Sequence, residues 1–255
     1  MKVGAIGGTG VYDPTWLDHP QEVEIKTPYG SVTVMEGALA GHEDAVYFLN
    51  RHGAGHALPP HRVNYRANLW ALRELGVKRV IATAAVGSMN LAMAPGSLVL
   101  VDQFLDFTKG RPSTFYEGGA AGVRHTDMTE PYCRESRQRI FESAQALGLS
   151  VVLGGVYVAT EGPRFESAQE IRAYRLLGGD VVGMTGVPEV VLARELGLCY
   201  AAVALVTNFA AGLTGQPLTH EEVLEVMRAQ TQQVQTLLKM ALARVAEPYA
   251  CSCPA

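Results

Sequence analysis

The stretch "CYAAVALVTN" (residues 199–208) is an apolar run that ends on the polar pair Thr207 and Asn208. A continuous apolar run of strand length, with a glycine shortly before and after it, is typical of a strand buried on both faces of a sheet. Such strands belong to α/β folds, in which ligands bind where the strands end. The run therefore predicts a fold class and also the place of the site, with the Asn208 amide at a strand end.

On either side of this stretch, short apolar runs alternate with segments of helical period. Strands are expected at 2–8, 45–50, 79–87, 97–104, 151–160 and 180–185, and a hairpin is expected over 23–37. Helices are expected at 64–76, 134–148, 167–179, 188–197 and 220–247. Both hairpin and strand-helix-strand connections are present. We therefore expect one α/β domain over residues 1–255, with a central mixed β-sheet flanked by helices and a C-terminal tail at about 248–255.

The composition limits the kind of partner. The 255 residues are 48% hydrophobic, which suffices for a well-buried core. A net charge of −4 and a pI near 6.0 give no general attraction for nucleic acid or an anionic membrane. The glycine-rich start lacks the apolar centre of a signal peptide, and no stretch has the roughly 20 apolar residues of a membrane span. We expect a cytoplasmic chain that binds a small molecule.

The four cysteines fall into two groups. Cys133 and Cys199 are isolated, and we interpret them as ordinary buried thiols. Cys251 and Cys253 are separated by one residue near the C-terminus. These two could pair, bind a metal or reach back to another cysteine, or they could lie in a loose tail, and the sequence leaves these alternatives open.

Several expected strands end on residues that suit an anion. Thr9 lies in a Gly-Gly-Thr-Gly loop after the first strand, where N–H groups and a hydroxyl can meet an oxyanion. This loop is not a dinucleotide fingerprint, because Asp13 stands where the third glycine is needed. Arg51 and His52 follow another strand, and a guanidinium is a forked donor that matches phosphate.

Two other kinds of site are disfavoured by spacing. His52, His56 and His61 are interrupted by glycines and have no carboxylate close in sequence, so we expect no zinc site there. Ser88 has Val86 where a nucleophile elbow requires glycine. Neither a metal nor a serine nucleophile is predicted.

The chain resembles the trimeric purine nucleoside phosphorylase family, specifically its methylthioadenosine phosphorylase branch. The resemblance rests on six segments that occur in order and cover nearly the whole chain: IGGTGVYD, RHGAGHALPPHRVNYRANLWAL, DQFLDFT, TEGPRFES, MTGVPEVVLARE and ALVTN. It implies a nucleoside phosphorylase fold and activity, with inorganic phosphate as co-substrate and no metal or organic cofactor. It also implies assembly as a homotrimer or a dimer of trimers.

The same resemblance implies which residues bind each part of the substrates. The ribose is expected against Met184 and the base against Phe165. Phosphate is expected to be bound by Thr9, Arg51, His52, Ala84, Ala85 and Thr185. The methylthioadenosine branch commonly has Thr at the position of Ala84, so one phosphate-facing hydroxyl is missing here, although a backbone N–H can still serve.

Two departures from that branch point to the base. Family members that take 6-aminopurines resemble Thr-Asp-x-Asp where this chain has Asn208 and Ala210; an amide can donate to purine N7 and to a 6-oxo group. The 6-oxopurine enzymes carry a Phe-Glu pair like Phe165 and Glu166, and a carboxylate accepts from the N1–H of hypoxanthine or guanine. A mismatched base would leave a buried polar pair unsatisfied, at a cost of about 1–3 kcal/mol. We therefore predict a 6-oxopurine site.

Two histidines bear on the 5′ group. His220, in a His-Glu-Glu-Val-Leu segment, resembles the residue that meets the 5′-hydroxyl in inosine and guanosine phosphorylases, although the same segment also fits a helix start. His125 matches a family residue that is donated to the neighbouring subunit's 5′ pocket. The role of His125 would make an oligomer necessary for a complete site.

The leading interpretation is phosphate-dependent cleavage of inosine and guanosine to free base and ribose 1-phosphate, in purine salvage. Asn208, Arg51 and His52 are the expected catalytic residues. One rival is phosphorolysis of methylthioinosine or methylthioadenosine. Others are a nucleosidase that uses water and a nucleoside-binding protein without turnover.

Overall fold

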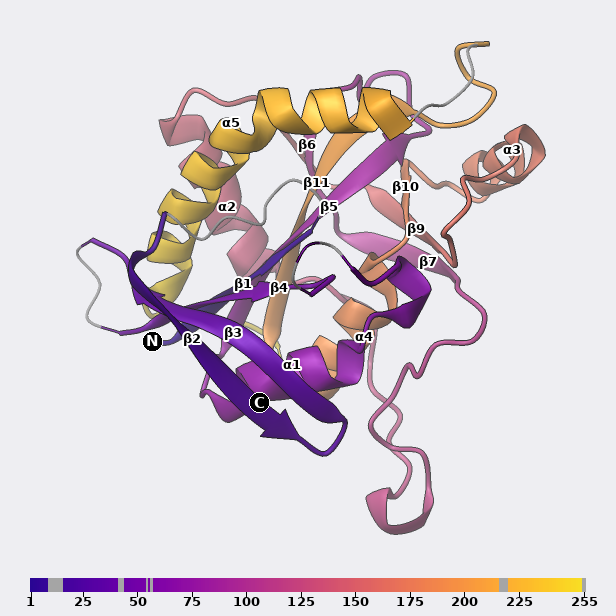
Figure 1. Cartoon of the computed structure of the whole chain (residues 1–255). Helices are drawn as coiled ribbons and strands as arrows, with labels where there is room; N and C mark the ends of the chain where they lie inside the picture. The colour runs from indigo at the N-terminus through magenta and orange to yellow at the C-terminus, as the bar shows by residue number, and fades with distance from the viewer. Residues whose placement is uncertain (9–15, 41–43, 54, 56, 216–219, 254–255) are drawn as a thin grey trace.

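The computed structural model describes residues 1–8, 16–40, 44–53, 55, 57–215 and 220–253, and of His220 and Glu222 the backbone alone. Within these residues the strands are β1 Val3–Gly7, β2 Asp18–Thr27, β3 Gly30–Ala38, β4 Val46–Asn50, β5 Arg79–Ser88, β6 Leu98–Leu100, β7 Gln103–Phe107, β8 Val151–Leu153, β9 Val156–Thr160, β10 Val181–Gly183 and β11 Cys199–Phe209. The α-helices are α1 Tyr65–Glu74, α2 Arg134–Ala146, α3 Ala168–Leu176, α4 Gly186–Glu195 and α5 His220–Ala246 (Figure 1).

All of these strands belong to one mixed sheet, which confirms the predicted α/β fold class. Its main path runs β2-β3-β4-β1-β5-β10-β9-β7, and β11 lies beside β5 and also pairs β6, which pairs β8. β5 is therefore the strand at which the sheet divides. Its first half pairs β1 in parallel, its last two residues pair β10 antiparallel, and β11 follows it in parallel from end to end.

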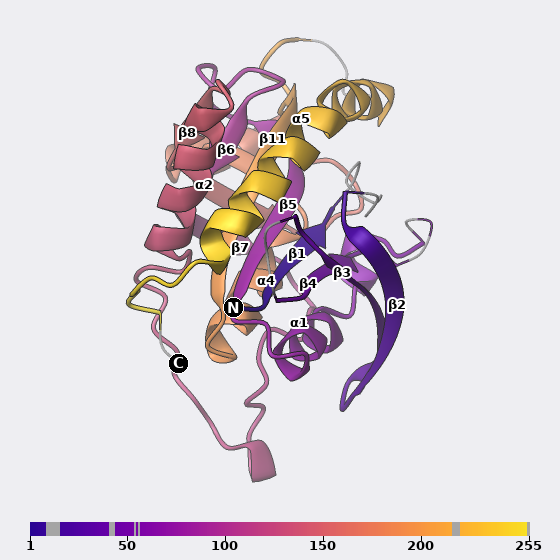
Figure 2. The ribbon, with the colours of Figure 1, turned by 90° about the vertical axis from the view of Figure 1, so that its left-hand side faces the viewer.

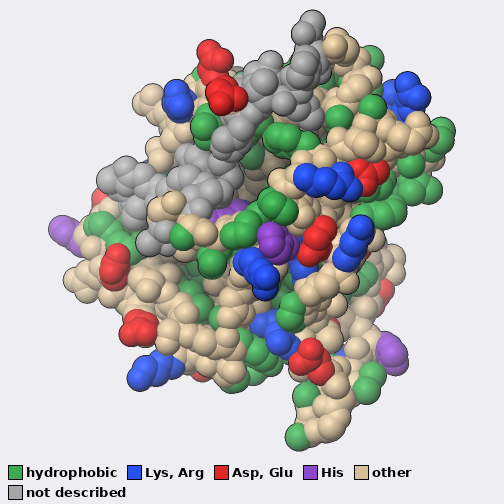
Figure 3. All heavy atoms as spheres, turned by 45° about the vertical axis from the view of Figure 1, so that its right-hand side comes forward, with side chains coloured by type: hydrophobic (Ala, Val, Ile, Leu, Met, Phe, Trp, Pro, Cys, Tyr) green, Lys and Arg blue, Asp and Glu red, His purple; other side chains and the backbone are tan. Residues whose placement is uncertain are grey.

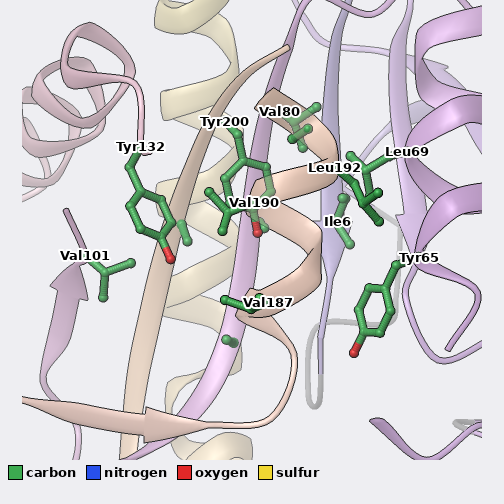
Figure 4. Packing of buried hydrophobic residues seen from close by; sticks show 14 of the residues in the cluster. Ile6, Tyr65, Leu69, Val80, Val101, Tyr132, Val187, Val190, Leu192 and Tyr200 are labelled. Carbon is green, nitrogen blue, oxygen red and sulfur yellow. The ribbon is translucent and has the colours of Figure 1, made fainter. Parts of the chain in front are cut away.

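Helices cover the two faces of the sheet. Figures 1 and 2 show α2 and α5 together over one face and α1 and α4 over the other. The side chains of β11 alternate between the two layers: Ala202, Ala204 and Val206 face α1 and α4, and Ala201, Val203 and Leu205 face α2 and α5. Figure 4 shows the first layer, where Val187 and Val190 of α4 pack with Tyr200 of β11. Burial on both faces is the reason why this run has no polar residue before Thr207.

Two runs that we expected to be single strands are each divided. Residues 97–104 form β6 and β7, and residues 151–160 form β8 and β9. The breaks meet in space, because the Asp102 carboxylate accepts from the Gly155 N–H at 3.0 Å. Gly154 has a φ of +108°, a conformation that an L residue rarely adopts. The turn there lets the chain leave β6 and β8 on one side of the sheet and enter β7 and β9 on the other.

The C-terminal tail is docked, so the loose-tail alternative is wrong for the described part. Arg79 donates to the carbonyls of Val245, Glu247 and Tyr249, and its guanidinium lies 3.4 Å from the centre of the Tyr249 ring. The Tyr249 hydroxyl is also 2.6 Å from the Ser136 hydroxyl of α2. These contacts hold residues 245–249 against the start of β5 and of α2.

The surface agrees with the modest net charge. Figure 3 shows acidic and basic side chains interspersed on the face that it draws. Among the described residues, no helix is both long enough and apolar enough to cross a membrane.

Candidate functional site

A cavity of about 420 Å³ opens where the sheet divides. It lies beyond the carboxyl ends of β1, β4, β5 and β11, which are parallel strands, and beside the end of β10. This is the place where open α/β sheets bind ligands. The structure brings ten of the predicted site residues to its wall: Arg51, His52, Ala84, Ala85, Phe165, Glu166, Met184, Thr185, Asn208 and Ala210.

Three predicted residues are not brought there by the described structure. Thr9 and the His220 side chain lie outside the described residues, although Val223, one turn further along α5, lines the cavity. His125 is exposed on the long segment between β7 and α2, which Figure 1 shows extending away from the sheet. Its expected role in a neighbouring subunit stays a prediction.

Arg51 is buried and held in a fixed orientation. Its Nε and Nη2 each donate to the Glu189 carboxylate at 2.7 Å, and its Nη1 donates to the Thr83 carbonyl at 2.8 Å. The Tyr200 hydroxyl donates to the same carboxylate at 2.6 Å. A guanidinium has five N–H donors, so this clamp leaves two of them for a ligand. The forked face that we expected to bind phosphate is taken by Glu189, and only the remaining N–H groups are suited to it.

The positive charge of Arg51 is stable at neutral pH. Burial opposes the charge of Arg51, but the Glu189 carboxylate outweighs burial and raises the pKa of Arg51 above its ordinary value. Burial, reinforced by Glu189, raises the pKa of Tyr200, so its hydroxyl keeps the proton that it donates. Arg51 therefore faces the cavity as a permanent cation.

His52 lies beside Arg51 at the end of β4. Its Nδ1 is 2.8 Å from the Leu58 carbonyl, and a carbonyl can only accept. The proton is therefore on Nδ1 and is donated to Leu58, which fixes the orientation of the ring. The same contact anchors the Leu58-Pro59-Pro60 segment that forms one wall of the cavity.

The wall of the cavity beside Arg51 is made of small residues and backbone. At Gly8, a Cβ would lie 2.7 Å from both the Arg51 Nη1 and the Thr83 carbonyl, so only glycine fits there. The Gly8 N–H donates to the Thr83 hydroxyl at 3.1 Å, which ties the end of β1 to β5. Thr185 precedes α4, and its hydroxyl does not cap that helix, whereas its N–H donates to the Tyr157 hydroxyl. The Thr185 side chain, which also contacts the Tyr157 hydroxyl, lines the cavity.

Glu166 also lines the cavity and is 9% exposed. Its Oε1 accepts a hydrogen bond from the Thr160 hydroxyl at 2.6 Å. A carboxylate oxygen can accept more than one hydrogen bond, so the fixed group can still receive a donor from a ligand. Phe165 lines the same cavity and is 40% exposed, which suits a ring that stacks on a bound base.

Asn208 is aimed by an irregularity in β11. The register against β5 shifts between Val206 and Asn208, so Thr207 is an extra residue in the strand. The Asn208 Nδ2 donates to the Phe209 carbonyl at 2.9 Å, and its Oδ1 is 2.8 Å from the Thr207 hydroxyl. Because a carbonyl only accepts, Phe209 fixes which end of the amide carries the N–H groups. The second N–H remains for a ligand.

The sequence did not reveal two buried charges beside the site. Glu189 lies in the segment MTGVPEVVLARE, but the sequence does not show that it binds Arg51, because the two residues are 138 positions apart. Arg111 donates to the carbonyls of Met184, Thr160 and Glu161 at 2.6, 3.1 and 2.6 Å. It thereby joins the segments that carry Glu166 and Thr185. An isolated Arg in a polar loop gives no signal of such a role.

Comparisons with known proteins agree with this architecture. Residues 2–243 match the model of the phosphorylase superfamily. The chain belongs to the phosphorylase superfamily. The family predicted from the sequence is thereby confirmed.

The relatives span the full length of the chain. It is 52% identical to the 6-oxopurine nucleoside phosphorylase of Pyrococcus furiosus, over 99% of this chain and 96% of that protein. It is 51% identical to a probable S-methyl-5′-thioinosine phosphorylase of Methanopyrus kandleri, over 99% and 96% of the two chains. The methylthioadenosine phosphorylase of Schistosoma mansoni in complex with adenine superposes with a TM-score of 0.91 at 37% identity, over 97% of this chain and 93% of that chain.

Proposed function

We propose that this member of the superfamily is a purine nucleoside phosphorylase that cleaves 6-oxopurine nucleosides, inosine and guanosine, to the free base and ribose 1-phosphate. The observation that carries the proposal is the pairing of Glu166 and Asn208 on the wall of one cavity, each with a fixed orientation. The relatives named as 6-oxopurine enzymes, at about half identity over the full length, support it.

The reaction needs an anion and a leaving purine on opposite sides of one carbon. A phosphate oxygen forms a bond to ribose C1′ while the bond from C1′ to the purine N9 breaks, and the electron pair of that bond passes to the base. The sugar gains positive character and the base negative character in the transition state. Holding phosphate and nucleoside in line supplies much of the acceleration.

At the phosphate end, Arg51 provides a permanent positive charge, and its two N–H groups outside the clamp donate to phosphate oxygens. His52, the Ala84-Ala85 backbone and the Thr185 hydroxyl complete the set. No step requires a metal or an organic cofactor.

At the base end, the free N–H of Asn208 donates to N7 and stabilises the negative charge that develops on the purine. Glu166 accepts from N1–H, which hypoxanthine and guanine possess and adenine lacks. Adenine would offer no N1–H to the Glu166 carboxylate, which is largely buried and would keep only the Thr160 hydroxyl as its donor. That mismatch costs about 1–3 kcal/mol or more, a discrimination of roughly ten- to a hundredfold.

A second candidate differs only in the 5′ group. Val223 and Leu58 give the cavity apolar wall, which suits a methylthio group, and one half-identical relative is a probable S-methyl-5′-thioinosine phosphorylase. Both candidates share the 6-oxopurine. We assign a 5′-hydroxyl substrate on the His220 segment, a role in purine salvage in the cytoplasm, and a trimer or dimer of trimers in which His125 reaches a neighbour.

The test is release of free base from inosine, guanosine, methylthioinosine and methylthioadenosine, each with and without phosphate. We expect phosphate-dependent cleavage of the first two. Cleavage without phosphate would indicate a nucleosidase, and binding without cleavage would indicate a nucleoside-binding protein. Preference for methylthioinosine would correct the 5′ assignment alone, whereas preference for methylthioadenosine would overturn the roles of Glu166 and Asn208.

A further inference from the structure

The four cysteines form one cluster at the end of β11 that is remote from the cavity. Cys133 is the residue before α2, Cys199 begins β11, and Cys251 and Cys253 lie in the tail after α5. Their four Sγ atoms all lie within 4.8 Å of one another. Among the described residues this is the one group of histidines, cysteines and carboxylates with such spacing that includes at least three ligands.

The framework of the fold places the first two thiols. The Cys133 N–H donates to the Tyr200 carbonyl at 2.8 Å, which fixes the start of α2 beside the first residues of β11. Both cysteines are buried. Their positions therefore depend on the sheet and on α2 and not on the tail.

The tail brings the other two thiols to the same point. Arg79 and the Tyr249 ring hold the chain up to residue 249, and Arg139 also lies over that ring at 4.6 Å. A bend at Ser252 then separates Cys251 from Cys253. In an extended chain residues i and i+2 point to the same side, so Cys251 and Cys253 can both face Cys133 and Cys199.

The spacing fits a tetrahedral thiolate site. Zn²⁺ binds cysteine sulfur at about 2.3 Å, which places the four sulfurs of a tetrahedral site about 3.8 Å apart. All four cysteines are free thiols, and the Sγ atoms of Cys199 and Cys251 are 3.3 Å apart. Four thiols gathered around one point, without division into two bonded pairs, is the arrangement that a single soft cation requires.

We propose that Cys133, Cys199, Cys251 and Cys253 bind one Zn²⁺ ion in a closed structural site. Four protein ligands fill the tetrahedral positions, so no position is left for water or substrate. Four thiolates and one Zn²⁺ carry a net charge of −2, and Arg79 and Arg139 are cations held at the adjacent Tyr249. The ion fastens the C-terminal tail to the starts of α2 and β11.

The proposal is tested on the full chain expressed with added zinc and purified without reductant. Elemental analysis should find about one zinc per chain. Replacing Cys251→Ser and Cys253→Ser together should abolish bound zinc and lower Tm by several degrees, whereas Ser252→Ala in the same tail should keep the zinc. Cleavage of inosine at moderate temperature should persist in the double variant, because the cluster lies at the other end of β11.

A second measurement keeps the proposal falsifiable if the double variant folds poorly. The wild-type chain is denatured with a chelator, alkylated and weighed by mass spectrometry. Four alkylated cysteines together with one released zinc support the site. Cysteines that resist alkylation until a reductant is added are disulfides, and this result would overturn the proposal. Four free thiols without any zinc would also overturn it, and so would iron bound in place of zinc.

Discussion

We expect two residues to determine which base is preferred. Asn208 has a fixed amide, and Ala210 has no polar group. Both residues line the cavity, and Ala210 is buried. Replacing Asn208→Asp and Ala210→Asp together provides two carboxylates that accept from a 6-amino group. We expect the ratio of kcat/KM for adenosine over that for inosine to rise by at least tenfold.

The matched control pairs Asn208→Asp with Ala211→Asp, because Ala211 does not line the cavity. That variant should lose inosine cleavage without gaining adenosine. An unchanged preference in the first variant would show that these positions do not read the base.

The clamp between Arg51 and Glu189 predicts an effect on phosphate. Glu189→Gln removes the negative charge from a fully buried pair, and breaking such a pair costs about 3–5 kcal/mol of stability. We expect a lower free energy of unfolding in urea and a raised KM for phosphate, with a much smaller change in KM for inosine.

Glu195→Gln is the control for Glu189→Gln. Glu195 is a buried carboxylate on the same helix, but it accepts from the Thr114 hydroxyl and the Phe115 N–H and does not contact Arg51. It should lower stability and leave the KM for phosphate unchanged. Equal effects of the two variants on that KM would argue against a positioning role of Glu189.

At the scale of single elements, the N-terminus of α3 fixes the position of the segment that carries Glu166, because α3 begins directly after that segment. Ser167 caps the helix by accepting from the Glu170 N–H at 3.2 Å, while the Glu170 carboxylate accepts from the Ser167 N–H at 2.7 Å. Ser167→Ala should lower the free energy of unfolding by about 1 kcal/mol. It should also raise the KM for inosine, because Glu166 is the adjacent residue.

Urea unfolding and initial-rate kinetics measure both effects. Ser150→Ala, at an exposed serine outside the cavity, serves as the control and should change neither quantity. A loss of stability with an unaltered KM would mean that α3 anchors the fold without positioning Glu166.

Hydrophobic periodicity predicted most helices and strands correctly, because it reflects which face of each single element is buried. The five expected helices and the β2-β3 hairpin are present close to the expected bounds. The division of residues 97–104 and 151–160 was not predicted, although Asp102 and Gln103 interrupt the first apolar run and Gly154 and Gly155 the second. The break depends on the contact of Asp102 with Gly155 in the other run, which the pattern of either run does not show.

The same contrast holds at the site. The strand ends that carry Arg51, Glu166 and Asn208 could be found from sequence, since a polar residue after an apolar run is a local signal. The orientation of each side chain could not, because it depends on single contacts that the pattern does not show. Glu189 fixes Arg51 from 138 positions away. Thr160 fixes Glu166 across the loop that follows β9. The sequence thus indicates which residues line the site. It does not indicate which of their donor and acceptor atoms are left unused by contacts within the protein.

At the scale of the whole molecule, the proposed role of His125 in a neighbouring subunit predicts that subunits share their sites. If this proposal holds, a His125→Ala subunit keeps its own cavity but cannot supply a neighbour, and an Asn208→Ala subunit has the opposite defect. We expect each variant alone to cleave inosine poorly and mixed oligomers to regain activity.

Mixing after partial denaturation and joint refolding, followed by an inosine assay, measures this recovery. Each variant refolded alone is the control for the procedure. Mixed samples no more active than the average of the two would show that His125 does not serve a second subunit.

The position of β11 has a consequence for synthesis of the chain. β11 pairs with β5 from Cys199 against Arg79 to Phe209 against Ser88, yet 120 residues separate the first of these pairs. While the polypeptide leaves the ribosome, one long edge of β5 stays unpaired until about the last fifth of the coding sequence is translated. A prematurely terminated product that lacks β11 would keep that edge open, and unpaired apolar strand edges promote aggregation. Truncated translation products of this protein should therefore accumulate as aggregates and not as partly active fragments.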